Sequence, residues 1–275
     1  MRSSFPKEFF TSQKIRARKS LGQSFIKDHY VLERIGEIAG LSNEDEVLEI
    51  GAGLGALTVF LAERVKRVVA IEKDKRFLER LSQTLSHLKN IEIIFGDVLQ
   101  IKLREFYQEN KIKLVSNLPY SISSPILLKL LEERDIFSLL TIMVQREVGQ
   151  RICAPPGGRQ YGSLSVLIQT YMDATVELHI SPEAFWPRPA VHSVVVKLIP
   201  LQSPRVYISD GELYRKVIRA AFSSRRKMIG NSLLSIFPRE YVEEILKVSG
   251  VDRKRRAETL SVEEFGMLVQ SASKM

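Results

Sequence analysis

The hydrophobic pattern in the middle of the chain alternates between short β-branched runs and stretches with helical spacing. In the segment from residue 54 to residue 65, for example, Leu54, Leu57, Leu61 and Val65 recur at the spacing of an amphipathic helix. Strands that alternate with helices predict an α/β domain with a mostly parallel sheet, covered on both faces. The segments predicted to be strands are Glu46–Ile50, Arg67–Ile71, Ile91–Phe95, Lys113–Ser116, Leu139–Val144, Thr175–Ile180 and Ser193–Ile199.

The last two predicted strands have no long helix between them. A proline-rich linker, Ser181–Pro189, joins them instead. Parallel neighbours need a long crossover, whereas antiparallel neighbours do not. We therefore expect these two strands to pair antiparallel at one end of the sheet.

After Pro200 the β-rich runs stop and helical patterns remain. The chain is long enough for one large and one smaller domain. We place the boundary so that residues 1–203 form the α/β domain, with a basic N-terminal arm, and residues 204–275 form a small helical domain. The helices predicted there are Glu212–Phe222, Arg226–Ile236, Arg239–Val248 and Val262–Ser271.

The excess of positive charge lies at the two ends of the chain. The net charge is +9 at pH 7. Residues 1–34 hold eight Lys or Arg and three Asp or Glu, residues 206–275 hold thirteen and nine, and residues 35–205 hold twenty of each. Proteins that bind a polyanion with their flanks have such a distribution, but a solvated basic surface would have it too. Charge alone leaves nucleic-acid binding open.

Composition and missing motifs exclude several classes of protein. The apolar runs are far shorter than the roughly 20 residues that span a bilayer, and the polar N-terminus has no apolar segment typical of a secretory signal. Cys153 is the only cysteine and the four histidines are scattered, so neither a disulfide nor a metal site is expected. There is no serine-hydrolase or Walker motif. We expect a cytoplasmic protein without a membrane segment.

A glycine-rich turn follows the first predicted strand. Gly51, Gly53 and Gly55 form G-x-G-x-G, in which missing side chains allow a ligand to approach the backbone at a helix N-terminus. Glu72 lies 21 residues after Gly51, at the end of the next strand, where a carboxylate can bind both hydroxyls of a ribose. Asp97 ends the third strand, where it can accept a hydrogen bond from an adenine amino group.

Two other interpretations of these residues are open. The glycine pattern alone also fits a dinucleotide fold, but Ala56 follows Gly55, so the turn departs from G-x-G-x-x-G. Glu72 or Asp97 alone could simply cap the next helix. Three such features at the ends of three successive strands favour a nucleoside-containing cofactor, bound at the carboxyl ends of the strands.

Asn117-Leu118-Pro119-Tyr120 stands at the end of the fourth predicted strand, and this motif resembles that of N6-adenine methyltransferases. More narrowly, the chain resembles the rRNA adenine N6,N6-dimethyltransferases, which modify two adjacent adenosines near the 3′ end of small-subunit rRNA. The segments that carry the resemblance are Lys19–Ile26, the glycine turn, Asn117–Tyr120, Gln145–Val148, Tyr161–Ser165, Phe185–Ser193 and Ala221–Lys227.

The resemblance implies a Rossmann-like, seven-stranded methyltransferase domain that binds S-adenosylmethionine. Glu49, before the glycine turn, is expected to orient the methionine end of this cofactor. Ser24 stands where the family usually has Asn, and it can still donate and accept a hydrogen bond. The cofactor-binding residues that we expect are Gln23, Ser24, Ile26, Glu49, Gly51, Gly53, Glu72, Lys73, Asp97, Val98 and Asn117.

The resemblance also implies catalytic roles. The Asn117 side-chain oxygen and the Leu118 or Pro119 carbonyl are expected to accept hydrogen bonds from the adenine amino group. Tyr120 and Phe185 are expected to stack on the two faces of the flipped base. In isolation, Asn117–Tyr120 could be an ordinary strand exit and Phe185 a hydrophobic plug under a loop.

Basic residues of the C-terminal domain are expected to contact phosphates without reading sequence. They form two clusters, Arg225, Arg226 and Lys227, expected to open a helix, and Arg253 with Arg256. The expected partner is small-subunit rRNA or the assembling small subunit, bound by a monomer.

Three other functions are weighed against this interpretation. A large-subunit rRNA adenine N6-methyltransferase of the macrolide-resistance type shares the cofactor and Asn117–Tyr120 motifs, but chain length and Phe222–Lys227 favour the small-subunit enzyme. A non-catalytic assembly factor that binds the cofactor would not need an intact Glu72, Asp97 and Asn117. A dehydrogenase is a more distant alternative.

Overall fold

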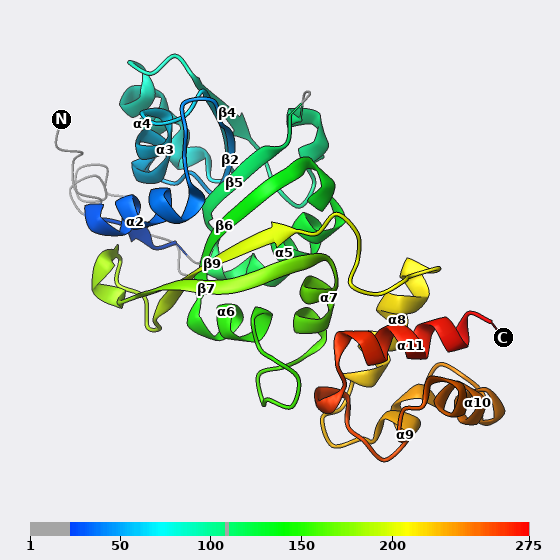
Figure 1. Ribbon diagram of the computed structural model, residues 1–275. Helices are drawn as coiled ribbons and strands as arrows, with labels where there is room; N and C mark the ends of the chain where they lie inside the picture. Colours follow the sequence, from blue (N-terminus) through cyan, green and yellow to red (C-terminus); the bar gives the residue numbers. More distant parts are fainter. Residues whose placement is uncertain (1–22, 108–109, 275) are drawn as a thin grey trace. The chain divides into compact units, whose positions relative to one another are not determined.

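The structure, a computed structural model, describes residues 23–107 and 110–274. Its main strands are β2 (Glu46–Ile50), β3 (Arg67–Glu72), β4 (Ile91–Phe95), β5 (Ile112–Asn117), β6 (Phe137–Gln145), β7 (Met172–Ile180) and β9 (Ser193–Pro200). They form one seven-stranded sheet in the order β4-β3-β2-β5-β6-β9-β7 (Figure 1). The pairs from β4 to β6 are parallel, and β9 runs antiparallel to β6.

Helices cover both faces of this sheet, as α/β folds require (Figure 1). The helices before and between the strands are α2 (His29–Ala39), α3 (Ala56–Ala62), α4 (Lys75–Leu85), α5 (Ser123–Glu132), α6 (Arg146–Ile152) and α7 (Ser163–Tyr171). On the face covered by α2, α3 and α4, Leu61, Phe77 and Leu81 pack with Val68 and Ala70 of β3 in one buried core. Burying these apolar side chains stabilises the face at about 25 cal/mol per Å².

A second sheet has only two short strands, β1 (Phe25–Ile26) and β8 (Phe185–Trp186). They pair antiparallel, with Phe25 opposite Trp186 and Ile26 opposite Phe185. The pairing joins the start of the described chain to the proline-rich linker between β7 and β9. We call residues 23–26 the N-terminal strap.

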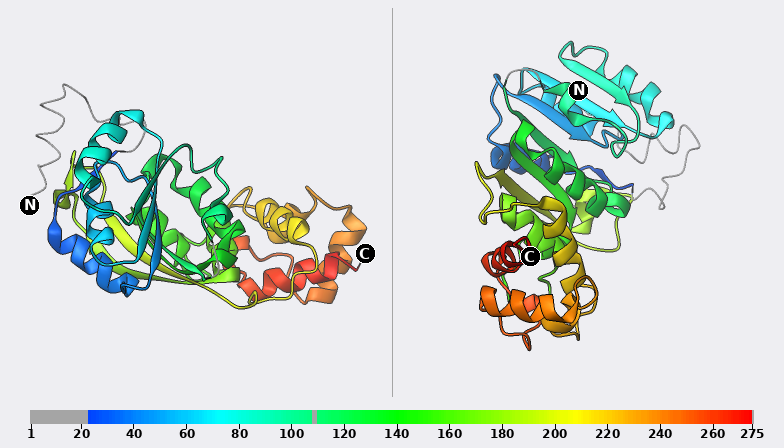
Figure 2. Two further views of the ribbon diagram at one scale, coloured as in Figure 1. Left: turned by 90° about the horizontal axis from the view of Figure 1, so that it is seen from above. Right: turned by 90° about the vertical axis from the view of Figure 1, so that its right-hand side faces the viewer.

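The chain divides into two compact units. Unit 1 comprises residues 1–149 and 175–200, and unit 2 comprises residues 150–174 and 201–275. Unit 2 therefore takes in a segment that the expected boundary at residue 203 assigned to the first domain. Its later helices are α8 (Gly211–Ala221), α9 (Ile229–Leu233), α10 (Arg239–Ser249) and α11 (Val262–Ala272), which pack together (Figure 2).

The seven predicted strands are all present, and the last two are neighbours at one edge of the sheet. Two helix predictions were too long. The helix expected over residues 54–65 begins only after Gly55, whose φ is +85°, and the helix expected from Arg226 begins at Ile229 because residues 225–227 form turns. Every helix among the described residues is too short or too polar to cross a membrane.

Gly149 on α6 provides a test of how tightly this helix packs on the sheet. A Cβ at this position would lie 2.2 Å from Val194 Cγ2 on β9. We expect Gly149→Ala to lower the free energy of unfolding by about 1–3 kcal/mol through overpacking, although alanine favours helix by about 1 kcal/mol. Urea unfolding followed by circular dichroism measures the change.

Gly211→Ala is the matched control, because a Cβ on this first residue of α8 has no neighbour within 4 Å. It should leave stability unchanged or slightly higher. Equal stability of the Gly149→Ala variant and the wild type would contradict the close packing of α6 on β9.

Candidate cofactor and catalytic site

Backbone hydrogen bonds fix the glycine turn between β2 and α3 against the end of β3. The Gly51 N–H donates to the Ile71 carbonyl over 2.8 Å, and the Gly53 N–H donates to Glu72 Oε2 over 2.7 Å. Gly53 has a φ of +55°, and a Cβ there would lie 2.7 Å from the Phe25 ring. Only glycine therefore suits position 53 while the strap lies across the turn.

A cavity of about 440 Å³ opens beside this turn, within unit 1. Its walls come from the strap, the glycine turn, the residues that follow β3 and the residues that follow β5. The volume is in the range of small-molecule and cofactor sites. The predicted site residues that line it are Gln23, Ser24, Ile26, Glu49, Gly51, Gly53, Glu72, Lys73, Asn117, Leu118 and Pro119.

Glu49 supplies a buried carboxylate to this cavity. Glu49 is only 2% exposed, and its Oε2 has no hydrogen-bond partner among the described residues. Burial, together with the negative charge of Glu72, raises the pKa of Glu49 to about 8. A carboxylate in this state is suited to a cationic ligand group, which would restore its charge and its hydrogen bonds.

Glu72 differs from Glu49 because both of its oxygens are bound by the backbone. Oε2 accepts from Gly53 N–H, and Oε1 accepts from Asp74 N–H over 2.7 Å. Burial still raises its pKa above the ordinary value. Glu72 therefore joins the glycine turn to the start of α4, and each of its oxygens can still accept a further hydrogen bond in the cavity that Glu72 lines.

Asn117 is oriented by a bond to the strap. Its Nδ2 donates to the Ser24 carbonyl over 2.9 Å, while its Oδ1 is buried without a partner in the described part of the chain. The next residue, Leu118, donates its N–H to the Met143 carbonyl over 3.0 Å. The amide is thus fixed with an unused acceptor at the cavity.

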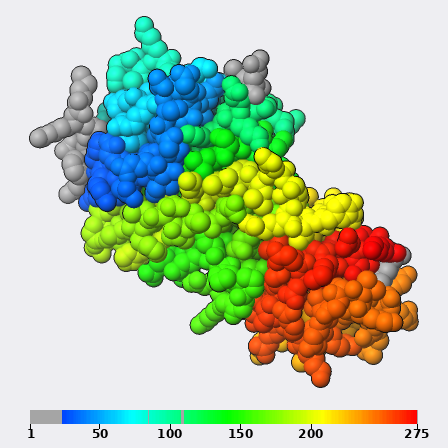
Figure 3. Space-filling view, in the orientation of Figure 1, coloured from blue at the N-terminus to red at the C-terminus, as the bar shows by residue number. Residues whose placement is uncertain are grey.

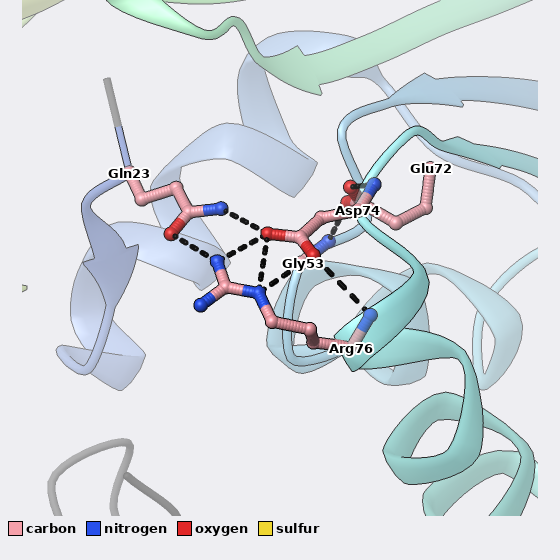
Figure 4. A network of polar contacts seen from close by, with 5 residues as sticks. All are labelled: Gln23, Gly53, Glu72, Asp74 and Arg76. Carbon is pink, nitrogen blue, oxygen red and sulfur yellow. Dashed lines mark hydrogen bonds and ion pairs between the residues drawn. The ribbon is translucent and has the colours of Figure 1, made fainter. Parts of the chain in front are cut away.

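The strap is fastened at its start by a polar cluster (Figure 4). Gln23 Nε2 donates to Asp74 Oδ2 over 2.9 Å, and Arg76 Nε donates to Asp74 Oδ1 over 2.8 Å. The hydrogen bond from Arg76 lowers the pKa of Asp74 to about 2, so this cluster keeps its charges at any pH above about 4. Phe25 adds an edge-to-face contact with Phe77, with ring centroids 5.5 Å apart.

Ser24, the departure from the family pattern, also makes a contact within the protein that the sequence did not indicate. Its hydroxyl donates to the Pro187 carbonyl over 3.2 Å, and its own carbonyl accepts from Asn117. Ser24 still lines the cavity. In this structure it therefore joins the strap to the linker after β8 as well as contributing to the cavity wall.

Asp97 and Val98 do not line the cavity. Asp97 Oδ1 accepts from Leu99 N–H over 3.0 Å and Oδ2 from Lys73 Nζ over 2.6 Å, and the Lys73 bond lowers the pKa of Asp97. Val98 is buried. No helix begins directly after Asp97; its carboxylate binds the turn that follows β4 and the Lys73 side chain, and Lys73 lines the cavity. Binding of the adenine amino group by Asp97 stays a prediction.

The two aromatic residues expected to stack on the base differ in exposure. Tyr120 is half-buried, and its hydroxyl lies 2.6 Å from Ser193 Oγ. Phe185 is 1% exposed and packs in the core, opposite Ile26 in the β1–β8 pair. Its stacking on the base stays a prediction, and it requires that one face of this buried ring be uncovered.

Several site residues were missed from the sequence. Asp74, Phe25 and Phe77 line the cavity, and Ser193 binds Tyr120. Asp74 could have been found from the sequence, because an Asp directly before an amphipathic stretch is typical of a helix N-cap. It does cap α4. Ser193 ends the Phe185–Ser193 motif, but nothing in the sequence indicated its contact with Tyr120.

The cavity fits S-adenosylmethionine by the chemistry of its acceptors. This cofactor carries an ammonium, a sulfonium and two ribose hydroxyls, and the cavity is lined by the carboxylates of Glu49, whose Oε2 has no partner among the described residues, and of Glu72. Phe25 and Leu57 supply apolar wall. No group of three or more potential metal ligands occurs among the described residues.

The basic residues predicted to bind RNA lie in unit 2 and differ in their surroundings. Arg225, Arg226 and Lys227 are exposed in the turns after α8. The Arg253 guanidinium forms an ion pair with Glu243, which reduces its charge toward a ligand. Arg256 is exposed before a short 3₁₀ turn.

The raised pKa of Glu49 predicts a pH-dependent stability of the cofactor-free protein. The folded state keeps the proton up to about pH 8, whereas the unfolded chain loses it near 4.5. This contribution is complete below pH 4.5 and is lost as pH rises through 8, with a slope approaching about 1.4 kcal/mol per pH unit between them. Glu49→Gln should flatten the profile, measured by urea unfolding from pH 5 to 9.

The protonation of Glu49 can also be measured through cofactor binding. If the bound cofactor returns the charge to Glu49, wild-type protein should release close to one proton on binding at pH 7, and Glu49→Gln should release none. Calorimetry in buffers of different ionisation enthalpy measures this number. Equal proton release by both proteins would contradict a protonated Glu49.

The bond between Ser193 and Tyr120 predicts a role for Ser193 in turnover. Ser193→Ala should lower kcat about 3- to 10-fold, since a neutral hydrogen bond contributes about 0.5–1.5 kcal/mol, with little change in cofactor affinity. Ser193→Thr, which keeps the hydroxyl, is the control. A matched loss in both variants would indicate disturbed packing of β9 rather than loss of the bond.

Comparison with known proteins shows the family to which the chain belongs. The family model described as ribosomal RNA adenine dimethylase matches residues 14–274. A protein named ribosomal RNA small subunit methyltransferase A from Geobacter metallireducens is 43% identical over 260 residues, covering 92% of this chain and 94% of its own. The protein of the same name from Clostridium botulinum (strain Langeland) is 45% identical over 265 residues, covering 95% and 96%.

Solved structures show the same fold. A dimethyladenosine transferase from Plasmodium falciparum superimposes with a TM-score of 0.79 at 26% identity, covering 91% of this chain and 98% of its own. The 23S rRNA methyltransferase ErmE superimposes with a TM-score of 0.69, also at 26% identity, covering 90% and 99%. The match over nearly the whole length, together with the identities above 40%, shows that the chain belongs to the ribosomal RNA adenine dimethylase family.

Proposed function

We propose that this protein transfers methyl groups from S-adenosylmethionine to N6 of two adjacent adenosines near the 3′ end of small-subunit rRNA, up to two on each. Family membership supports the reaction class. The observation that carries the proposal is the buried, unpartnered Oδ1 of Asn117, fixed beside the cofactor cavity by the Nδ2 bond to Ser24.

The chemistry explains why an acceptor is needed there. The N6 lone pair of adenine is delocalised into the ring, so the amino nitrogen is a poor nucleophile. An acceptor that binds an N6 hydrogen favours a more tetrahedral nitrogen with its lone pair available, and Asn117 Oδ1 is such an acceptor. When bound, S-adenosylmethionine supplies a methyl group already activated by its sulfonium. The site therefore contributes positioning and electrostatics rather than a strong base.

Tyr120 is the aromatic residue that we propose to stack on the base. The target adenine has to leave its stack to reach a buried acceptor, and a base stacked on an aromatic ring gains about 1–3 kcal/mol. Tyr120 follows the Asn117 amide by three residues and is tied through its hydroxyl to Ser193. Burial raises the pKa of Tyr120 above its ordinary value, so the hydroxyl stays protonated.

A large-subunit rRNA adenine methyltransferase is the second candidate, since ErmE shares the fold. Identities of 43–45% to proteins named for the small subunit, against 26% to ErmE, favour the small-subunit substrate. A non-catalytic assembly factor is disfavoured by the intact Asn117 and Glu49. We infer further that the enzyme acts as a monomer on the assembling subunit in the cytoplasm.

The direct test uses labelled S-adenosylmethionine with small subunits that lack the modification, and large subunits in parallel. Nucleoside mass spectrometry then identifies the product. Dimethyladenosine in the small-subunit RNA alone is the expected result. Label in the large-subunit RNA would favour the second candidate, and cofactor binding without label in either would overturn the enzymatic proposal.

Asn117→Ala tests the acceptor itself. It should bind the cofactor within about threefold of the wild type but lose at least 100-fold in kcat, as removal of an oriented polar group at a reacting centre does. Ser121→Ala is the control, because Ser121 lines the same cavity without a hydrogen bond among the described residues. Unchanged turnover in Asn117→Ala would rule out the acceptor role.

A further inference from the structure

A second cavity lies wholly within unit 2, whereas the cavity described above is lined by residues of unit 1. Its volume is about 460 Å³, and Arg151, Arg159 and Arg225 line it. All three are exposed, and none forms an ion pair in the part of the chain that the structure describes. Other arginines, such as Arg104 and Arg205, are neutralised by Asp135 and Asp173. With three arginines and one acidic residue, Glu258, in its lining, the cavity has a net positive charge.

The backbone around the cavity is open and fixed in place. Gly157 has a φ of +89°, and a Cβ there would have no neighbour within 4 Å. The Gly157 N–H donates to the Glu258 carbonyl over 2.6 Å, which brings the segment near residue 157 (green) against the segment near residue 258 (red in Figure 3). Helix α7 starts at the cavity wall with Gly162 as its N-cap and no side-chain cap, so the positive end of its dipole adds to the arginine charge.

One wall of the cavity is aromatic. Phe222 is half-buried and lines the cavity, and its ring lies 6.1 Å from Tyr161 and 5.7 Å from Phe265, centroid to centroid. These contacts restrain the ring, and Phe222 remains partly exposed in the cavity wall. An aromatic surface beside several guanidinium groups is the combination with which proteins bind single-stranded nucleotides.

We propose that this cavity binds one unpaired nucleotide of the substrate RNA, distinct from the adenosine that is methylated. Its phosphate is bound by Arg151, Arg159 and Arg225, and its base lies against Phe222. The proposal rests on the proposed function for the identity of the ligand as RNA. A single inorganic anion would leave Phe222 uncovered, whereas 460 Å³ is in the range that a nucleotide-sized ligand occupies. The Glu258 side chain, which also lines the cavity, can accept from a ribose hydroxyl or a base amino group.

The arginine part is tested with the double variant Arg151→Gln/Arg159→Gln. Affinity for small-subunit RNA is measured over a range of salt concentrations, together with cofactor affinity and the unfolding midpoint. We expect RNA affinity to fall about tenfold near 0.1 M salt and the slope of log K against log salt to decrease by about 1, as loss of one phosphate contact predicts. Cofactor affinity and the midpoint should not change.

The control is Arg219→Gln/Arg239→Gln, which removes the same charge from exposed arginines of unit 2 that do not line the cavity. It should change RNA affinity less than threefold. Equal effects of the two double variants would overturn the proposal in favour of a general basic field, and so would the absence of any effect.

The base part is tested with Phe222→Leu, which keeps apolar volume but removes the ring. RNA affinity should fall about fivefold or more, the lower end of what a stacked base contributes. An unchanged affinity in a folded protein would overturn base binding.

Wild-type methylation distinguishes the cavity proposal from the proposed function. If the wild type methylates small-subunit RNA while the arginine variant matches its control, only the cavity proposal fails. If wild type binds RNA through these arginines but methylates nothing, only the proposed function fails.

Discussion

The hydrogen bond from Gly53 N–H to the buried Glu72 carboxylate is the constraint on which the site depends. A buried carboxylate is costly unless donors surround it, and Glu72 obtains them from backbone on both sides, Gly53 in the glycine turn and Asp74 before α4. These two bonds fix the turn relative to the end of β3. Because position 53 has no side chain, the Phe25 ring can lie across the turn.

The acceptors that remain for ligands differ from Glu72 because they have no hydrogen-bond donor among the described residues. Glu49 Oε2 and Asn117 Oδ1 are buried and have no partner within residues 23–107 and 110–274, and each such group costs about 1–3 kcal/mol in the folded protein. The same cavity is thus lined by oxygens with two different roles. The Glu72 oxygens bind the backbone and hold the turn in place, whereas Glu49 Oε2 and Asn117 Oδ1 are left to bind ligands. Bound ligands that donate to these atoms recover the cost, which makes ligand binding and local stability interdependent.

Features governed by local pattern could be predicted from the sequence, and features governed by long-range contacts could not. The seven strands, the glycine turn and the place of Asn117 follow from β-branched runs and strand-end motifs. Burial of Phe185 depends on pairing of two-residue strands 160 positions apart, too short to leave a periodic pattern. Asp97 is turned toward Lys73 by a contact that no spacing encodes. Charge suggested that basic residues matter, but whether a given arginine is neutralised, as Arg253 is by Glu243, depends on tertiary packing.

The course of the chain between the two units has a consequence for synthesis on the ribosome. The chain leaves unit 1 after residue 149, returns at residue 175 and leaves again after residue 200. The strand made last, β9, is an interior strand between β6 and β7. Tandem domains fold one after another as they emerge, but here a nascent chain that ends before β9 exposes the open edge of β6, and unit 2 still lacks its four later helices. Unit 1 is therefore complete only once residue 200 has been made, and until then the nascent chain presents an unpaired strand edge that can pair with other chains.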